Sequence, residues 1–89
     1  MKINRRRSNI EIIGDMLKVG EKGAGKTEIM YSTNMSFSQT QKYLDFLISH
    51  NFITKTEIQY QPVTYKITEA GLKLLKSIDN VKEILGWND

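Results

Sequence analysis

Only two segments of this chain have the composition of β-strands, and they are close neighbours. Residues 52–58 (FITKTEI) and 63–67 (VTYKI) are rich in β-branched and aromatic residues, and the sequence between them contains Pro62, the only proline. Two such runs joined by a short turn segment predict a β-hairpin. In the other segments the apolar residues have helical spacing. We therefore expect a mainly α-helical fold with one small hairpin, which belongs to the α+β class.

Two helices are predicted in the first third of the chain. Apolar residues recur at three- and four-residue intervals between Ile10 and Leu17, which is helical spacing. Ser8 or Asn9 can cap the start of this helix, and the glycines that follow end it. Thr27 suits the N-cap of a short second helix, which a turn-forming Ser-Thr-Asn sequence closes.

Two longer helices are predicted on either side of the hairpin. Ser36 and Gln39 fit a capping box at the start of the third helix, and Asn51 suits a left-handed residue at its end. Thr68 can cap the last helix, which Gly86 ends. Along this helix four apolar residues repeat at four, three and four residues, in a heptad-like seam: Leu74, Ile78, Val81 and Leu85.

The element order resembles the winged helix-turn-helix fold. Residues 35–53 look like the turn, recognition helix and first wing strand of that family. Residues 65–75 look like its second wing strand and last helix, with Thr68 and Gly71 in the usual Thr-x-x-Gly position. Residues 25–47 are similar to small archaeal proteins that pair two winged helices through an antiparallel coiled coil of C-terminal helices.

This resemblance implies a domain over residues 8–68 and a dimerisation helix over residues 69–86. The implied partners are double-stranded DNA and a second copy of the chain, held through the heptad-like seam. The seam residues can instead pack on the first helix within one chain. The recognition helix would place its N-terminal residues against base edges in the major groove, which nominates Ser36, Ser38, Gln39 and Gln41. Lys42 is nominated for a phosphate contact, and Phe37 can pack on a sugar or a thymine methyl group or cover the edge of the core. Glutamine can pair with adenine through two hydrogen bonds.

The positive charge of the sequence is concentrated in an N-terminal arm, residues 1–7. Lys2, Arg5, Arg6 and Arg7 contribute +4, whereas residues 8–89 hold nine lysines against ten acidic residues, which is −1, and the sum is +3. Such arms enter a minor groove, steer association or remain solvated. The predicted DNA contacts are completed by three residues outside the arm and the recognition helix: Lys26, Lys55 and Gln61.

Residues 20–27, GEKGAGKT, match the phosphate loop of nucleotide hydrolases. That loop follows a buried strand and precedes a long helix, but here helical spacing precedes it and a turn soon follows. We therefore expect no enzyme and no catalytic residue. Two alternatives remain for this segment, a contact with DNA phosphate through Lys22 and Lys26, or a plain glycine-rich connector.

Several classes of site are not expected. The chain has no cysteine and one histidine, His50, so we expect no disulfide, metal or cofactor, and no small-molecule ligand is evident. No apolar run approaches the roughly 20 residues of a membrane span, and we expect a cytoplasmic, nucleoid-associated protein.

The leading interpretation is a sequence-specific, homodimeric transcriptional regulator. The alternatives are a weakly specific chromatin protein and a protein-interaction module. The weak charge of residues 36–66, with three lysines against two acidic residues, keeps the interaction module open.

Overall fold

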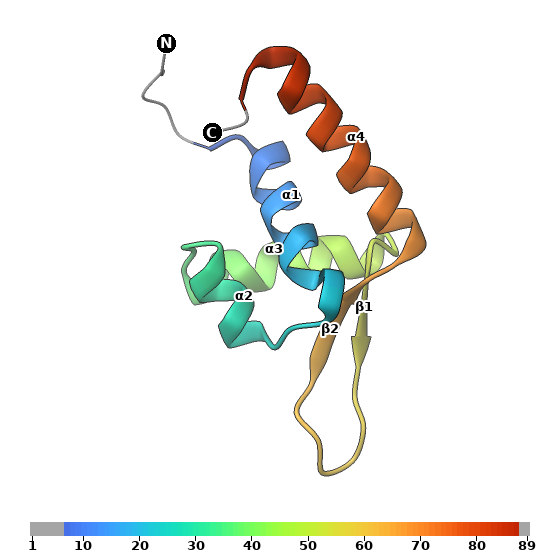
Figure 1. Cartoon of the computed structure of the whole chain (residues 1–89). Helices are drawn as coiled ribbons and strands as arrows, with labels where there is room; N and C mark the ends of the chain where they lie inside the picture. Colours follow the sequence, from blue (N-terminus) through green and yellow to red (C-terminus); the bar gives the residue numbers. More distant parts are fainter. Residues whose placement is uncertain (1–6, 88–89) are drawn as a thin grey trace.

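The computed structural model describes residues 7–87, which form four α-helices, a short 3₁₀ helix and a two-stranded antiparallel sheet (Figure 1). This confirms the predicted fold class and element order. Along the chain the elements are α1 (Asn9–Val19), η1 (Gly20–Lys22), α2 (Lys26–Ser32), α3 (Phe37–Ser49), β1 (Ile53–Thr56), β2 (Thr64–Ile67) and α4 (Glu69–Leu85). Within residues 7–87, no helix has the length and apolar character needed to cross a membrane.

α1 and α3 begin with the same arrangement, a capping box. Ser8 Oγ accepts from the backbone N–H of Glu11 at 3.2 Å, and the Glu11 carboxylate accepts from the Ser8 N–H at 2.9 Å. Ser36 and Gln39 make the equivalent pair at 3.2 and 3.3 Å. Each pair satisfies two backbone donors that a helix start leaves unpaired. Asn51 follows α3 with a φ of 61°, the predicted left-handed conformation.

α2 does not begin where the sequence predicted. Thr27 is not its N-cap, because α2 starts at Lys26 and Gly25 is the N-cap in extended backbone, with a φ of −78°. The cause lies in the preceding residue. Ala24 and Tyr65 exchange two backbone hydrogen bonds, of 2.9 and 2.8 Å, which hold the chain extended against β2 until the helix begins.

The hairpin has shorter strands than its composition predicted. β1 and β2 pair from Ile53 with Ile67 to Thr56 with Thr64. Between them residues 57–63 form the wing loop, which projects beyond the helices (Figure 1). Within this loop Tyr60 has a φ of 66° and the Gln61 N–H donates to the Ile58 carbonyl at 3.0 Å.

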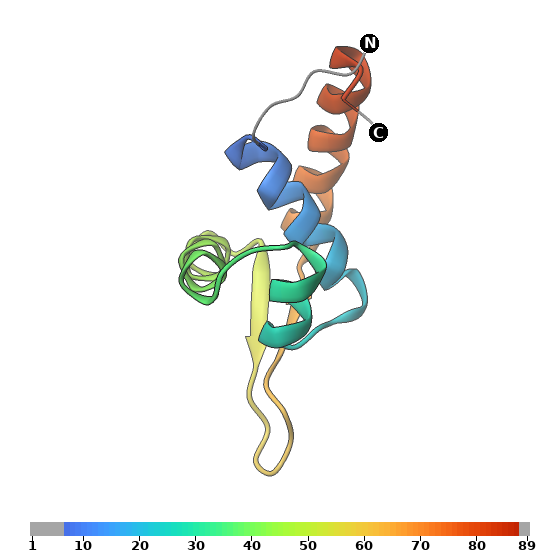
Figure 2. The ribbon, with the colours of Figure 1, turned by 90° about the vertical axis from the view of Figure 1, so that its left-hand side faces the viewer.

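The core lies where α1, α2, α3, the sheet and the first half of α4 meet. Its buried apolar residues are Met16, Leu17, Ala24, Ile29, Leu44, Leu47, Ile53, Tyr65, Ile67, Leu75 and Ile78. The rest of α4 extends past this core at the end opposite the wing loop (Figure 2). The molecule is therefore elongated, with extents of 49 × 26 × 20 Å.

Thr68 and Gly71 form the joint between α4 and the end of α3. The Thr68 hydroxyl donates to the carbonyl of Asn51 at 2.6 Å and accepts from the backbone N–H of Gly71 at 3.0 Å. A Cβ atom at Gly71 would lie 2.2 Å from the carbonyl oxygen of Phe52, which is shorter than the closest contact that a Cβ atom can make without displacing its neighbour. The Thr-x-x-Gly sequence therefore has a packing reason, because only glycine allows α4 to start this close to β1.

Candidate nucleic-acid interface

α3 divides cleanly into a buried face and an exposed N-terminal end. Thr40, Leu44 and Leu47 are fully buried in the core. The predicted contact residues at the other end of the helix are exposed, namely Ser36, Phe37, Ser38, Gln39 and Lys42. Figure 2 shows α3 end-on at one side of the molecule. The N-terminal end of the helix thus presents a polar surface together with the aromatic ring of Phe37, whose exposed fraction is 62%.

Lys26 and Gln41 lie together beside this surface. The Lys26 ammonium donates to the amide oxygen of Gln41 and stands 5.2 Å from the centre of the Phe37 ring. The amide nitrogen of Gln41 donates to Asp45 Oδ1 at 2.8 Å. The start of α2 is thereby attached to α3, and Gln41 is half-buried rather than presented to solvent.

The glycine-rich segment of residues 20–27 is attached to the sheet through an isolated bridge between Ala24 and Tyr65. It follows a helix, α1, and its first residues form the 3₁₀ helix η1. Gly23, with a φ of 83°, then turns the chain so that Ala24 pairs with Tyr65 of β2. The strand that a nucleotide-binding phosphate loop follows is absent at this point of the described chain. The glycines therefore belong to a connecting segment that brings the chain from α1 to the edge of the sheet.

The wing loop is more apolar than its predicted role required. Lys55 on β1 makes an ion pair with Glu57, with 3.6 Å between Nζ and Oε1. Gln61 is exposed, as expected. Tyr60 is 96% exposed and Ile58 is 52% exposed, and neither was among the predicted contact residues. The available signal for Tyr60 was its position two residues before Pro62, between the two strand-like segments. Ile58 was included in the first of those segments.

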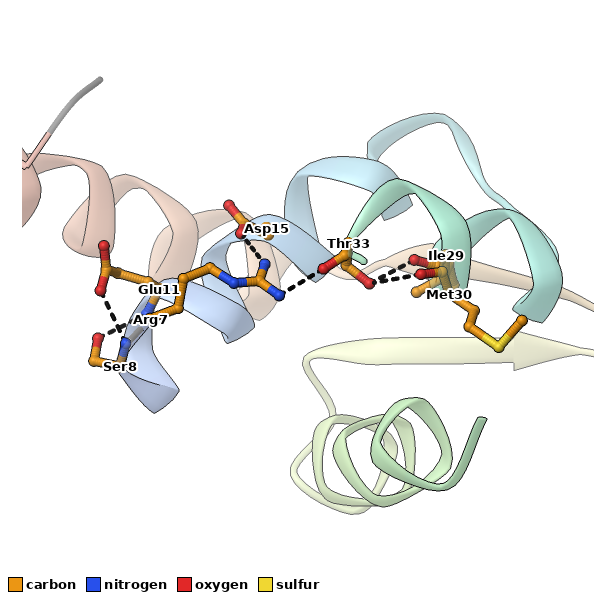
Figure 3. Close-up of polar contacts among 7 residues, drawn as sticks. All are labelled: Arg7, Ser8, Glu11, Asp15, Ile29, Met30 and Thr33. Atoms are coloured by element: carbon orange, nitrogen blue, oxygen red, sulfur yellow. Dashed lines mark hydrogen bonds and ion pairs between the residues drawn. The ribbon is translucent and has the colours of Figure 1, made fainter. Parts of the chain in front are cut away.

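Arg7 is tied to the body of the domain rather than left free (Figure 3). Its guanidinium makes an ion pair with Asp15 at 2.7 Å and donates to the carbonyl of Thr33 at 2.6 Å. Thr33 is the C-cap of α2, where a cation interacts favourably with unpaired carbonyl groups. The predicted contacts Arg5 and Arg6 lie outside the described residues.

The heptad-like seam of α4 is divided between two environments. Ile78 is 5% exposed and belongs to the core, and its Cγ2 lies 3.0 Å from where a Cβ at Gly14 would be. Leu74 also packs against the core. Val81 and Leu85 are 43% and 51% exposed, however. The first half of the seam therefore packs on α1 within this chain, and the second half has apolar side chains open to solvent.

Comparison with known proteins decides the family. A family model described as winged helix-turn-helix matches residues 6–86. The chain belongs to the winged helix-turn-helix family. In this fold α2 and α3 are the two helices of the motif, α3 is the recognition helix and residues 57–63 are in the wing.

Two relatives of this winged helix-turn-helix chain are uncharacterised proteins of the archaeon Methanocaldococcus jannaschii. MJ0287 is 39% identical over 85 residues, which cover 92% of this chain and 82% of MJ0287. MJ0290 is 33% identical over 81 residues, which cover 90% of this chain but only 36% of MJ0290. The predicted resemblance to archaeal winged-helix proteins is confirmed.

Solved structures share the winged-helix fold. Sso10a-2, a DNA-binding protein from Sulfolobus solfataricus, superposes with a TM-score of 0.80 at 27% identity, over 90% of this chain and 83% of its own. A mutant of Lactococcus lactis ZitR in complex with DNA gives a TM-score of 0.72 at 16% identity, over 93% of this chain and 61% of its own. At that identity the likeness to ZitR concerns the fold alone.

Proposed function

We propose that this protein binds double-stranded DNA in a sequence-specific way and regulates transcription as a homodimer. The observation that carries the proposal is the exposed N-terminal end of α3, the recognition helix, with its polar residues and the ring of Phe37 facing solvent. A recognition helix uses this end to contact base edges in the major groove. The fold likeness to Sso10a-2, which is itself a DNA-binding protein, supports the same conclusion.

The distribution of charge supports specific binding over weakly specific coating of chromatin. Residues 8–89 carry −1, from nine lysines and ten acidic residues, so most of the attraction to phosphate must come from the arm of residues 1–7. Lys26 and Lys55 supply a few contacts to the backbone beside α3 and the wing, and Lys42 lies on the exposed end of α3 itself. Non-specific binding depends on many phosphate contacts, which this body does not offer. Association with the nucleoid follows from DNA binding.

The homodimer is proposed to form through the C-terminal segment of residues 69–86, which follows the DNA-binding domain of residues 8–68. The first half of α4 in this segment belongs to the domain core, and the exposed second half is the proposed interface. Ile84 is 74% exposed beside the exposed Val81 and Leu85. An apolar hollow of about 180 Å³ lies between α1 and α4, lined by Ile10, Ile13, Leu74, Ser77, Ile78 and Val81. A second α4 laid along this strip would cover it. A symmetric dimer then presents two recognition helices to a two-fold-related DNA site.

The test is the binding of random-sequence duplex DNA, followed by fluorescence anisotropy over a series of salt concentrations. We expect binding that weakens steeply as salt rises, because lysine and arginine release counterions from phosphate. Competition with duplexes selected from a random library then separates a regulator from a chromatin protein. A selected site should bind about a thousandfold more tightly than random DNA, or better. Equal affinity for both would contradict sequence specificity.

A protein-interaction module is the second candidate. It is supported by two of the proposed DNA-contacting lysines, which already have partners: Lys55 pairs with Glu57 and Lys26 donates to Gln41. The exposed Tyr60 and Ile58 of the wing loop also suit a protein surface. The same titration distinguishes the candidates. If the protein binds no duplex at low salt while remaining folded, the interaction module replaces the regulator.

A further inference from the structure

The two glutamines of the recognition helix differ in what they can offer to a base. Reading adenine requires a side-chain amide that presents its oxygen and its nitrogen together. Both ends of the Gln41 amide are occupied, the oxygen by Lys26 and the nitrogen by Asp45 at 2.8 Å. The partners come from α2 and from one turn further along α3. Gln41 therefore holds α2 and α3 together instead of reaching for DNA.

Gln39 offers only half of its amide. Its oxygen accepts from the backbone N–H of Ser36 at 3.3 Å in the capping box that starts α3. Among residues 7–87 its amide nitrogen has no hydrogen-bond partner, and the same is true of the Lys42 ammonium. Both residues are exposed. The amide and ammonium groups of the recognition surface consequently present hydrogen-bond donors, with no free amide oxygen beside them. The exposed hydroxyls of Ser36 and Ser38 can donate or accept.

Phe37 adds an apolar element next to these donors. Lys26 covers the ring from one side, 5.2 Å from its centre, while 62% of the residue remains exposed. An aromatic ring fixed at the N-terminal end of a recognition helix suits the C5-methyl group of thymine. In the major groove guanine presents two acceptors, N7 and O6, and thymine presents O4 beside its methyl group. Adenine presents one acceptor beside a donor.

We propose that the recognition helix reads guanine and thymine rather than adenine. In this assignment Gln39 and Lys42 donate to guanine N7 and O6 or to thymine O4, and Phe37 contacts the thymine methyl group. Gln41 is a positioning residue that reads no base. This rests on the proposed DNA-binding function, and it replaces the prediction from sequence that the glutamines pair with adenine.

The test begins with selection of a site from a random duplex library by the full-length protein, followed by chemically altered versions of that site. Replacing thymine with uracil removes only the C5-methyl group and should weaken binding of the wild type about fourfold, the value of burying one such group. The loss should disappear in Phe37→Ala. Replacing guanine with 7-deazaguanine removes N7 and should weaken binding about tenfold.

Two charge-matched variants separate reading from positioning. Gln39→Glu keeps a side-chain oxygen for the capping box but turns the free donor into an acceptor. We expect its selected site to gain cytosine, whose N4 amino group donates. Gln41→Glu keeps the bond to Lys26 but loses the bond to Asp45 and places two carboxylates together. It should therefore bind more weakly and still select the wild-type site. Adenine at the contacted positions of the site selected by the wild type would overturn the assignment. A selected site that changes for Gln41→Glu and not for Gln39→Glu would also overturn it. Failure of the wild type to bind any duplex overturns the proposed function itself.

Discussion

The guanidinium of Arg7 bridges the first helix and the end of the second, with 2.7 Å to the carboxylate of Asp15 and 2.6 Å to the carbonyl of Thr33 (Figure 3). Thr33 is itself buried, and its hydroxyl donates to the carbonyl of Ile29 at 2.6 Å. The last residue of the basic arm is thus attached to the turn that leads into α3. Arg7 therefore has a structural role within the domain, although it is the last of three consecutive arginines in the sequence.

We expect Arg7 to stabilise the domain more than it contacts DNA. Arg7→Gln should lower the free energy of unfolding by about 1 kcal/mol, because a half-exposed ion pair and a charge-assisted hydrogen bond are lost. Urea denaturation measures this change. Asp15→Asn gives the decisive comparison. It should also destabilise the domain and leave the salt dependence of DNA binding unchanged. If Arg7 is a phosphate contact held back by Asp15, the same variant steepens that slope by about 0.9.

A second prediction concerns the joint between α4 and β1. Gly71→Ala should lower stability by about 3 kcal/mol or more, since its Cβ would lie 2.2 Å from the Phe52 carbonyl oxygen and backbone cannot give way. The matched control is Gly86→Ala, where φ is +74° but nothing lies within 4 Å. That variant should cost about 1–2 kcal/mol from backbone strain alone. Equal thermal midpoints for the two variants would contradict the close packing at Gly71.

The two capping boxes allow stability to be separated from DNA binding. Ser8→Ala and Ser36→Ala each remove a side-chain acceptor from the start of a helix and should each lower stability by about 1 kcal/mol. Only Ser36 lies at the exposed end of α3, where its hydroxyl also donates to the amide oxygen of Gln39 at 3.3 Å. We therefore expect Ser36→Ala to weaken DNA binding several-fold at a temperature where both variants are folded, while Ser8→Ala binds as the wild type does. Equal affinities would argue against α3 as the recognition helix.

The features that could be predicted from sequence were those set by neighbours along the chain. Capping bonds join residues three positions apart, so the roles of Ser36 and Thr68 could be inferred directly, and Ser8 could be inferred as one of two candidates with Asn9. The left-handed residue Asn51 is equally local. The start of α2 was missed because its cause, the pairing of Ala24 with Tyr65, joins residues far apart in sequence. No local pattern in the glycine-rich string indicates that pairing.

The candidate site shows the same division. The resemblance nominated contact residues at the start of α3, and all of them except the half-buried Gln41 are exposed. It could not indicate that Lys26 would take the amide oxygen of Gln41, because this contact depends on how α2 and α3 pack. Spacing also grouped Ile78 with Val81 and Leu85 in one seam. Only the packing of α1 against α4 assigns Ile78 to the core of its own chain.

The final prediction concerns the exposed half of that seam. Leu85→Lys should convert a dimer into a monomer without unfolding the chain, because the residue is 51% exposed in the single subunit. In a two-fold dimer each substitution acts twice, so we expect the dissociation constant to rise at least tenfold. Sedimentation velocity over a concentration series measures it. The control is Tyr31→Lys, at a residue of α2 that is 76% exposed, which should leave the dimer intact.

Ile78→Ala completes the comparison, because Ile78 is a core residue of the single chain. It should lower the free energy of unfolding by about 2–5 kcal/mol, the usual range for truncating a buried aliphatic side chain. Leu85→Lys should change monomer stability little. A dimer that survives Leu85→Lys would place the interface away from the end of α4. A wild type that stays monomeric at the highest concentrations would remove the homodimer, and with it the expectation of a two-fold-related DNA site.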